Sequence, residues 1–306
     1  MSPRTKSYFL LFTATVIWGV AGPVIKYTER FMPSLIFLLY RLAISAAVGI
    51  AALAVTKHHN WPKPGGQQLA ILVYGFLTTT VSLGLLFVGY ETTSALTASI
   101  LSALYPIMVA IVGMLFLHER VTRRENVGMG IALLGTAVVT LEPLLTHSAA
   151  SASTLLGNLL IIASLVVGVV ITVMAKLILR HAVNPISLTH LTFIIGFVTL
   201  APFVLSQFPL ATVIHSIQNA PLTAHLGVVY MALASGTIAY SLWDIGQKTI
   251  EIGESALFSY LYPVITLPLS IFWLHESIGL SLILGSLVVA LGVIIAETKK
   301  KHKKLT

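Results

Sequence analysis

The sequence predicts an all-α integral membrane protein with ten transmembrane helices, arranged as two inverted five-helix repeats. Three observations lead to this fold class: a very apolar composition, ten apolar runs separated by polar gaps, and an internal repeat. Of the 306 residues, 57% are hydrophobic and only 9% are charged, whereas an ordinary soluble domain carries about 25% charged residues. The mean hydropathy is +0.94. Too few polar side chains are present to cover a water-facing surface, so almost every residue must lie in or beside a bilayer.

The composition also excludes several classes of function. The chain has no cysteine, so disulfides, thiolate metal sites and cysteine nucleophiles are ruled out. The net charge of +8 lies in short gaps between apolar runs and in one tail, which is typical of membrane topology and not of nucleic-acid binding. No glycine-rich phosphate loop ending in Gly-Lys-Ser/Thr occurs, so ATP drive is disfavoured and no cofactor is expected.

Ten apolar runs are candidate membrane spans, which need about 20 mostly apolar residues each. The gaps between them contain helix breakers such as WPKPGG, EPLLTH and HAVNP. The first run lacks a small-residue cleavage site and is interpreted as a helix of the mature protein. The candidates lie near residues 8–26, 34–56, 69–89, 93–117, 125–142, 155–177, 186–206, 225–248, 255–274 and 279–296.

The lysines and arginines sort strongly between the two sides of the predicted bundle. With the amino terminus inside, fifteen of the eighteen fall on the inner side, and only Lys26, Arg30 and Arg41 lie outward. Cations are retained on the cytoplasmic side, so both termini are predicted to be cytoplasmic in a multi-pass protein of the cell inner (plasma) membrane. The lysine-rich tail is expected to touch anionic lipid.

Part of the sequence is written twice. LYPIMVAIVGMLFLHE at residues 104–119 returns as LYPVITLPLSIFWLHE at residues 261–276. The offset of 157 residues continues without a gap beyond this stretch, for example from Gly128 to Gly285. The length of the match indicates an internal duplication.

The duplication predicts two halves of opposite orientation. Five helices per copy is an odd number, so the second copy must lie upside down in the membrane. Inverted repeats are a common plan of transporters, with the site near the midplane where the repeats meet; a merely structural duplication is the alternative. The first repeat is predicted at residues 1–145, the inverted second repeat at 150–298 and a basic cytoplasmic tail at 299–306.

These motifs resemble those of the drug/metabolite transporter superfamily, and in particular of its EamA-type members. The resemblance covers nearly the whole chain: ten helices, two five-helix halves, Ile17-Trp18-Gly19 in the first helix, Arg41 in the second, and a helix-ending His-Glu in each half. It implies export or exchange of small metabolites by alternating access, often of amino acids or related compounds. The related small multidrug resistance proteins use a carboxylate in their first helix for proton coupling, and helices one and six here contain no acid, which puts a similar exchange in doubt.

The repeated Leu-Tyr-Pro motif marks the predicted substrate chamber, near the centres of helices four and nine. Because a proline lacks an N–H, the carbonyl four residues back, on a serine, needs another donor or a water-lined cavity. We therefore expect both helices to expose unpaired backbone carbonyls beside tyrosine and serine hydroxyls, and to bend at the prolines as hinges. Ordinary proline kinks without a functional role are the alternative. The substrate-binding and hinge candidates are Ser102, Tyr105 and Pro106 in the first half and Ser259, Tyr262 and Pro263 in the second.

Helices three and eight carry a second matched set of small and hydroxyl residues, at 78–82 and 235–237. Such residues allow close helix approach, and their hydroxyls bond back to carbonyls of their own helix, so most are expected to pack. Thr79, Ser82 and Ser235 are the members expected to face the chamber.

Three aromatic residues could line the same chamber. Trp18 lies at mid-depth in the first helix, too deep for the interfacial aromatic belt. With Tyr240 and Trp243 it could form a pocket for an apolar, aromatic or cationic moiety; simple packing is the alternative.

Three ionisable residues within the spans are candidates for a gate or for coupling. Asp244 is the single aspartate of the chain; a charge inside a span marks a functional hypothesis, but a pair with Lys248 would be structural. Arg41, about two turns inside helix two, could bind a substrate carboxylate or phosphate, snorkel outward or pair with a glutamate. His190 could accept a proton or simply pack.

Glu119 and Glu276 end the two copies of the repeated stretch. A carboxylate at a helix end can accept N–H bonds from the start of the next helix, so the pair is predicted to form a structural clasp at opposite faces of the membrane. This position makes both residues poor candidates for substrate ligands.

Together these features predict a secondary transporter or facilitator, acting as an exporter of small polar metabolites such as amino acids. A monomer is the simplest expectation. The alternatives are a non-transporting receptor or scaffold, which would gain nothing from matched prolines, and an intramembrane enzyme. Metal or acid–base catalysis needs clustered carboxylates, histidines or cysteines, and the spans offer Asp244 and His190 alone, so neither enzyme activity nor a metal site is expected.

Overall fold

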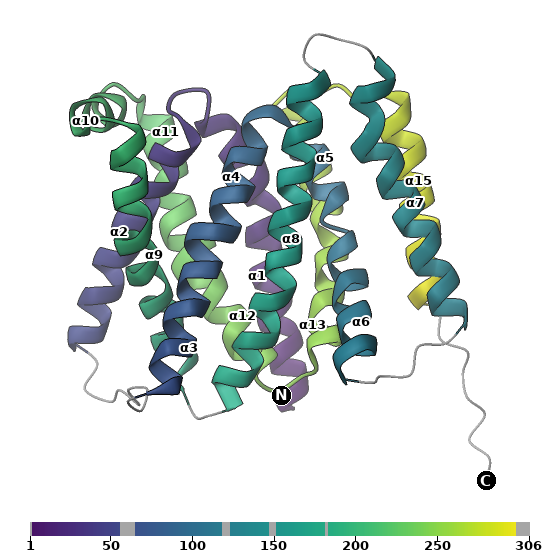
Figure 1. Cartoon of the computed structure of the whole chain (residues 1–306), viewed down its shortest axis with the longest axis horizontal. Coiled ribbons are helices and arrows are strands. Elements are labelled where there is room, and N and C mark those ends of the chain that lie inside the picture. The colour runs from purple at the N-terminus through teal and green to yellow at the C-terminus, as the bar shows by residue number, and fades with distance from the viewer. Residues whose placement is uncertain (1, 56–64, 118–122, 147–150, 181–182, 298–306) are drawn as a thin grey trace.

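The computed structural model describes residues 2–55, 65–117, 123–146, 151–180 and 183–297. Among these residues every regular element is a helix, and the long helices stand side by side as one bundle (Figure 1). In this view α1 begins, and α15 ends, at the lower side of the bundle (Figure 1). The described part of the chain is all-helical, as the sequence predicts.

The helices fall into groups that match the predicted spans. The first half contains α1 (Pro3–Thr28), α2 (Ser34–Val55), the run of α3 (Gly66–Gly75), η1 (Phe76–Ser82) and α4 (Leu83–Thr92), the pair α5 (Ala95–Leu101) and α6 (Leu104–Leu117), and α7 (Arg123–Thr146). The second half contains α8 (Ser151–Arg180), α9 (Pro185–Gln207), the run of α11 (Leu222–Val229), η2 (Tyr230–Ile238) and α12 (Ala239–Gln247), the run of α13 (Ile252–Ala256), η3 (Leu257–Leu261) and α14 (Tyr262–Phe272), and α15 (Leu280–Glu297). The short helix α10 (Leu210–Gln218) was not predicted.

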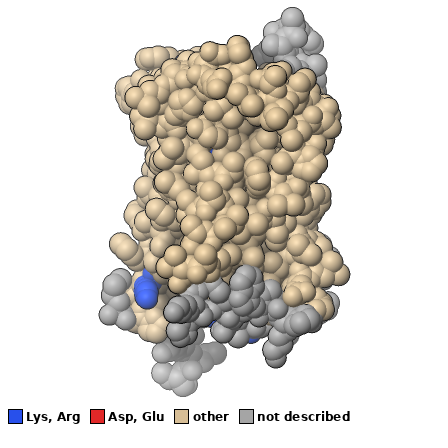
Figure 2. All heavy atoms as spheres, turned by 90° about the vertical axis from the view of Figure 1, so that its left-hand side faces the viewer, with Lys and Arg blue, Asp and Glu red and all other residues tan. Residues whose placement is uncertain are grey.

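The bundle has the surface of a membrane protein. Within the described residues, eight helices are long and apolar enough to cross a bilayer, and two shorter apolar helices, Asn126–Glu142 and Leu280–Ile295, lie at the fifth and tenth predicted spans. On the face in Figure 2, the clearly visible Lys and Arg atoms lie near the lower edge. Hydroxyl side chains such as Thr15 and Ser45 are fully buried. This apolar outside and partly polar inside is what lipid requires, so the chain is a multi-pass membrane protein.

Helix starts follow the local sequence. The Ser2 side chain accepts a hydrogen bond from the Thr5 N–H, and a proline follows at the first helical position of α1. Asn184 caps α9 in the same way, again with a proline next in the chain. Side-chain oxygens accept hydrogen bonds from the free N–H groups of a first turn. A proline is tolerated at the first helical position, because an N–H there would have no partner within the helix.

The third and eighth crossings each contain a π-helical segment at mid-length, η1 and η2. In η1 the N–H of Leu83 donates to the carbonyl of Thr78, five residues back. Moved by the 157-residue offset, η1 falls on residues 233–239 and overlaps η2. A π segment inserts an extra residue into a helix and frequently marks a functional site. The sequence predicts small residues here but not the wide turn.

The fourth and ninth crossings break at the repeated Leu-Tyr-Pro motif. α5 ends at Leu101 and α6 begins at Leu104, while the ninth crossing passes through the 3₁₀ segment η3 just before Tyr262. The serine carbonyls that were expected to need another donor receive it from the tyrosine N–H three residues on, at 3.0 Å between Tyr105 N and Ser102 O and likewise from Tyr262 to Ser259. A tight 3₁₀ turn therefore satisfies both carbonyls.

Helices α7 and α15 pack closely through glycines. A Cβ added at Gly135 would lie 2.8 Å from the carbonyl oxygen of Gly285, and one added at Gly292 would lie 2.6 Å from that of Gly128. Moved by the offset, Gly135 becomes Gly292 and Gly128 becomes Gly285, so the two contacts are counterparts of each other. Backbones this close tolerate no side chain between them.

Candidate functional site

A cavity of about 230 Å³ lies inside the bundle. Elements of both halves line it: α1, α2, η1, α4 and α6 of the first half and α8, η2, α12 and α14 of the second contribute residues. Its wall is mostly hydroxyl-bearing, aromatic and apolar, and Arg41 and Asp244 are the charged residues among those that line it. Ligand cavities commonly measure about 300–1,000 Å³. The cavity here is smaller than this range, so it suits a small molecule.

The structure brings most of the predicted site residues to this cavity. Thr79 is the exception among the substrate-binding candidates: it is fully buried, its hydroxyl donates to the Gly75 carbonyl, and it packs against Gly196 of α9. Its neighbour Thr78 lines the cavity instead, because the π turn changes which side chains face inward. The candidates that do line the cavity are Trp18, Ser82, Ser102, Tyr105, Ser235, Tyr240, Trp243, Ser259 and Tyr262, with Arg41 and Asp244.

Three pairs of lining residues that carry a hydroxyl in both halves are related by the sequence repeat. Thr78 corresponds to Ser235, Ser102 to Ser259 and Tyr105 to Tyr262. Each half thus supplies the same hydroxyl chemistry from the same two crossings, the π-helical one and the broken one.

The Trp18 indole forms part of the wall. Its Nε1–H donates to the carbonyl of Ser235 at 2.9 Å. Its ring lies 5.0 Å from that of Tyr240, edge to face, and 5.1 Å from that of Trp243. Such contacts fix the three rings relative to each other, so the wall is largely preformed.

A proline in α1 creates the contact between the first and ninth crossings. Pro23 lacks an N–H, so the carbonyl of Gly19 loses its helical donor. The hydroxyl of Thr266 in α14 donates to this carbonyl at 2.8 Å. Two residues earlier in α1, the Tyr230 hydroxyl donates to the Ile17 carbonyl at 2.6 Å. Sequence reasoning missed this arrangement, although a proline inside a span was the available signal.

Helix α8 supplies the opposite wall. The Tyr105 hydroxyl forms a short hydrogen bond with that of Thr172, and Gly168 lets the Tyr105 ring approach the helix. The Ser82 hydroxyl lies 3.2 Å from that of Ser164. These bonds orient hydroxyls of the first half toward the cavity.

Asp244 is held by neutral donors. Thr189 donates to one carboxylate oxygen at 3.1 Å and Gln247 to the other at 2.8 Å. Only 2% of the residue is exposed. The structural pair with Lys248, one of the two alternatives for Asp244, does not form, since the ion pair found among the described residues joins Arg4 and Glu254. Asp244 is thus a buried carboxylate with no cation beside it in the described structure.

Arg41 is also isolated. Its guanidinium lies 5.5 Å from the centre of the Phe87 ring, and a Cβ added at Gly236 would be 3.4 Å from Nη2. Glu91, one of the glutamates with which Arg41 could have paired, accepts hydrogen bonds from the Ser34 N–H and hydroxyl. Within the described chain, Arg41 forms no ion pair.

His190 does not reach the cavity. It is 5% exposed, and its Cβ and carbonyl lie against Gly49 of α2. The close approach of α9 and α2 explains the packing. Within the described residues, no group of three or more His, Asp or Glu side chains could hold a metal ion.

Glu276 does form a clasp, but with a different helix from the one expected. Its two carboxylate oxygens accept the N–H groups of Ala95 and Leu96 at 2.8 and 3.0 Å, so it caps α5 of the first half instead of α15. The free N–H groups of a first turn are natural donors to a carboxylate, and α5 presents them at this face. Glu119 lies outside the described residues.

Two lysines cap helix carboxyl ends at opposite faces. The Lys26 ammonium donates to the carbonyl of Tyr90 at 2.6 Å, and that of Lys176 donates to the carbonyl of Gln247 at 2.7 Å. Tyr90 and Gln247 are repeat counterparts. Glu29 lies near Lys26 and outside the spans; burial raises its pKa to about 9, which Lys26 opposes and Glu91 reinforces.

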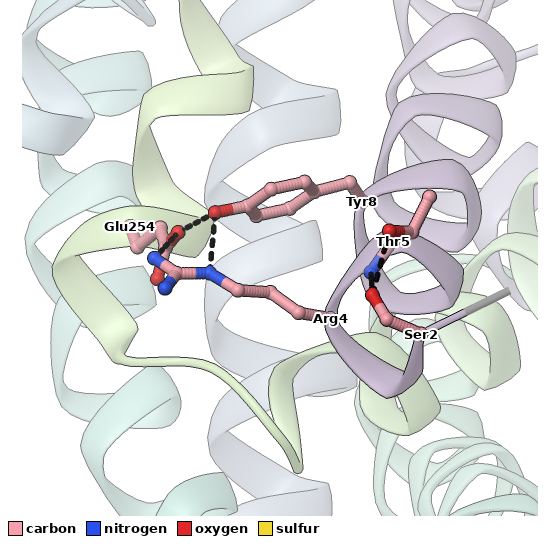
Figure 3. Close-up of polar contacts among 5 residues, drawn as sticks. All are labelled: Ser2, Arg4, Thr5, Tyr8 and Glu254. Atoms are coloured by element: carbon pink, nitrogen blue, oxygen red, sulfur yellow. Dashed lines mark hydrogen bonds and ion pairs between the residues drawn. The ribbon is translucent and has the colours of Figure 1, made fainter.

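A polar cluster joins the two halves at the amino-terminal face (Figure 3). Arg4 forms an ion pair of 2.6 Å with Glu254 of α13, and the Tyr8 hydroxyl donates to the same carboxylate. Arg4 also donates to Tyr8 at 2.8 Å. Beside it, the Ser7 and Thr249 hydroxyls form a short hydrogen bond. These contacts connect α1 to the second half at the face opposite Glu276.

Comparison with known proteins decides the class. The model of the EamA-like transporter family matches twice, at residues 5–141 and 155–298. The chain belongs to the EamA-like transporter family, within the drug/metabolite transporter superfamily. Family membership identifies it as a membrane transporter of small molecules and favours this class over an enzyme.

Relatives along the whole chain agree. An uncharacterized transporter of Archaeoglobus fulgidus is 28% identical over 96% of this chain and 100% of its own length. A probable amino-acid metabolite efflux pump of Escherichia coli is 23% identical, covering 95% of this chain and 94% of the pump. A probable terminal-alkyne amino-acid exporter of Streptantibioticus cattleyicolor is 26% identical, covering 96% and 94%. A solved crystal structure with 21% identity superposes with a TM-score of 0.61 over 96% of this chain and 98% of that one, which shows the fold.

Proposed function

We propose that this EamA-family protein is a secondary transporter or facilitator that exports small polar metabolites such as amino acids, by alternating access to the central cavity. The observation that carries the proposal is the cavity wall, to which the two halves contribute three repeat-related pairs of residues. A site built from equivalent parts of both halves is exposed to either side when the halves rock.

The cavity and the relatives support the substrate class. A cavity of about 230 Å³ lined by hydroxyls, aromatic rings and one residue of each charge suits a compact polar molecule. Two of the relatives are named as a probable efflux pump or exporter of amino-acid compounds.

Ten membrane spans in two inverted halves, residues 1–145 and 150–298, are part of the proposal. The two matches to one family model and the counterpart glycine contacts of α7 and α15 support it. Contact distances recur in this way when a two-fold axis relates the halves. The fifth and tenth spans are then α7 and α15.

The orientation is proposed from the charges. Retention of fifteen of eighteen cations on the inner side favours cytoplasmic termini in a plasma membrane protein. The start of α1 and the end of α15 on one side of the bundle (Figure 1) fit this assignment.

The moving parts are proposed to be the breaks before Pro106 and Pro263. Each face of the bundle is closed by contacts between the halves: the Arg4–Glu254 ion pair at one face and the Glu276 cap of α5 at the other. Opening one face requires breaking its contacts while the other set holds.

A flux assay tests the proposal. Purified protein in liposomes should move at least one labelled amino acid faster than empty liposomes, and imposing a proton gradient will reveal coupling. Tyr105→Ala or Tyr262→Ala should reduce this flux more than Glu142→Ala, since Glu142 does not line the cavity. The reverse order would exclude the cavity as the substrate site. Folded protein that moves no candidate metabolite would favour a receptor or scaffold.

A further inference from the structure

The cavity contains a cation with unused hydrogen-bond donors. Arg41 lines the cavity, although only 1% of the residue is exposed. Its Nε and Nη2 atoms are buried and have no hydrogen-bond partner in the part of the chain that the structure describes. These two nitrogens form one edge of the planar guanidinium, which matches the two oxygens of a carboxylate.

Such an arrangement is unfavourable for the empty protein. A guanidinium stays charged inside proteins, and a buried charge without a partner is strongly destabilising. The Phe87 ring, 5.5 Å away, interacts only weakly with a cation by comparison with an anion. Arg41 therefore has the properties of a group whose partner arrives with the ligand.

We propose that Arg41 binds the carboxylate of the transported metabolite. The inference rests on the proposed function and deepens it, because it requires a substrate that carries a carboxylate. The guanidinium donates two N–H groups to the carboxylate oxygens. Asp244, which also lines the cavity and is held by neutral donors, takes a cationic group such as the ammonium of an amino acid.

The charge of the cavity favours a carboxylate over a phosphate. Arg41 and Asp244 are the charged residues of the wall. A dianionic phosphate group would be matched by one cation and repelled by Asp244. A carboxylate balances the guanidinium with one charge, and an ammonium balances Asp244 with another.

Binding to the purified wild-type protein tests this requirement without any variant. The probes are the L-amino acids, the corresponding amino-acid amides and inorganic phosphate, and the readouts are thermal stability in detergent and quenching of tryptophan fluorescence, since Trp18 and Trp243 lie in the wall. We expect at least one amino acid to bind, its amide to bind on the order of 100-fold more weakly, and phosphate to have no effect. Equal binding of acid and amide, stabilisation by phosphate, or no binding of any acid would overturn the proposal.

Variants of Arg41 identify the residue responsible. Arg41→Gln should weaken binding of the acid on the order of 100-fold and abolish the preference for acid over amide. Arg41→Lys keeps the charge but loses the planar fork, so it should retain the preference and weaken binding about tenfold. The matched control Arg30→Gln removes an arginine that does not line the cavity and should change neither quantity. Acid preference that persists in Arg41→Gln would contradict the assignment.

These outcomes separate the inference from the proposed function. The binding assay needs no membrane and no flux. Flux of amides as fast as of acids would overturn the role of Arg41 and leave transport intact. Acid-selective binding without flux would support Arg41 and count against transport. If Arg41→Gln does not fold, the comparison of acid and amide binding to the wild type and to Arg41→Lys still tests whether Arg41 binds the carboxylate.

Discussion

The two halves of the protein share their backbone features and differ in their charges. Both have a π segment in the third crossing of the half, a break before the proline of the fourth, and a lysine that caps the same carbonyl position. At the cavity, however, Asp244 of the second half stands where the first has Phe87. The first half contributes the cation Arg41 and the second the carboxylate.

Under the proposed function, this difference separates two tasks. We propose that the shared backbone features serve the movement, because both halves must rearrange when access changes sides. The two unshared charges would serve recognition, because a substrate with two different ends needs two different charges in the wall. The predictions below test each class of feature.

The largest expected effect concerns a shared feature, the glycine contacts of α7 and α15. In Gly135→Ala the new Cβ would lie 2.6 Å from the backbone nitrogen of Val289, so the helices must separate at a cost of about 3 kcal/mol. The repeat counterpart Gly292→Ala should cost about the same. The melting temperature in detergent measures both.

Gly130→Ala in the same helix is the matched control. A Cβ there meets nothing within 4 Å, so the variant should be neutral or slightly stabilising through helix propensity. A large loss in only one of the two contact variants would argue against symmetric packing of the halves.

The next effect concerns the unshared carboxylate. Asp244→Asn keeps the shape of the side chain and removes its charge, and we expect substrate affinity to fall on the order of 30-fold. Glu142→Gln removes a carboxylate outside the cavity lining and should leave affinity unchanged. Equal flux curves for wild type and Asp244→Asn would show that the second pole of the cavity is not used.

A smaller effect concerns the hydrogen bond from Thr266 to Gly19, which has no repeat counterpart, because the residue equivalent to Thr266 in the first half is Val109. Thr266→Val leaves the Gly19 carbonyl without a donor and should cost about 1–2 kcal/mol. In a Pro23→Ala background the helix regains an N–H for this carbonyl, so the same substitution should cost about 0.5 kcal/mol or less. An unchanged cost in the two backgrounds would refute the proline explanation.

The last prediction concerns pH and Glu29. Its pKa in the folded protein is about 9, against about 4.3 in an unfolded chain. The unfolded state therefore loses its proton first as pH rises, and this group lowers stability progressively between about pH 5 and 9. Glu29→Gln should match wild type near pH 5 and melt several degrees higher near pH 8. A difference that does not change with pH would contradict the buried neutral carboxyl.

The features that follow from the chain's own periodicity could be predicted. Apolar runs locate the helices, and the 157-residue offset alone identifies Tyr105 and Tyr262 as equivalent positions of the two halves. These signals are local or are carried by the order of residues. Ser102 and Ser259, which the same repeat singles out, line the cavity.

The features that were missed depend on contacts between distant segments. The π turn of η1 changes the register of the helix, so Thr78 lines the cavity where Thr79 was expected. Glu276 caps α5 because a free first turn lies nearby in space, which no neighbouring residue in the sequence indicates. Likewise, nothing in the sequence around Lys176 indicates that it caps the end of α12.

Single-cysteine labelling tests the central claim most directly, because the chain contains no cysteine of its own. Ser259→Cys places one thiol in the cavity wall, and an impermeant thiol reagent is added to one side of oriented proteoliposomes at a time. The account predicts labelling from both sides. The Ser7 and Thr249 hydroxyls are hydrogen-bonded at the amino-terminal face, so Ser7→Cys and Thr249→Cys can be joined there by a disulfide. This disulfide is formed first, and the thiol of Ser259→Cys is labelled afterwards. The disulfide should block labelling from the amino-terminal face alone. A cavity thiol that is labelled from neither side, or from one fixed side whatever the state of the disulfide, would contradict alternating access.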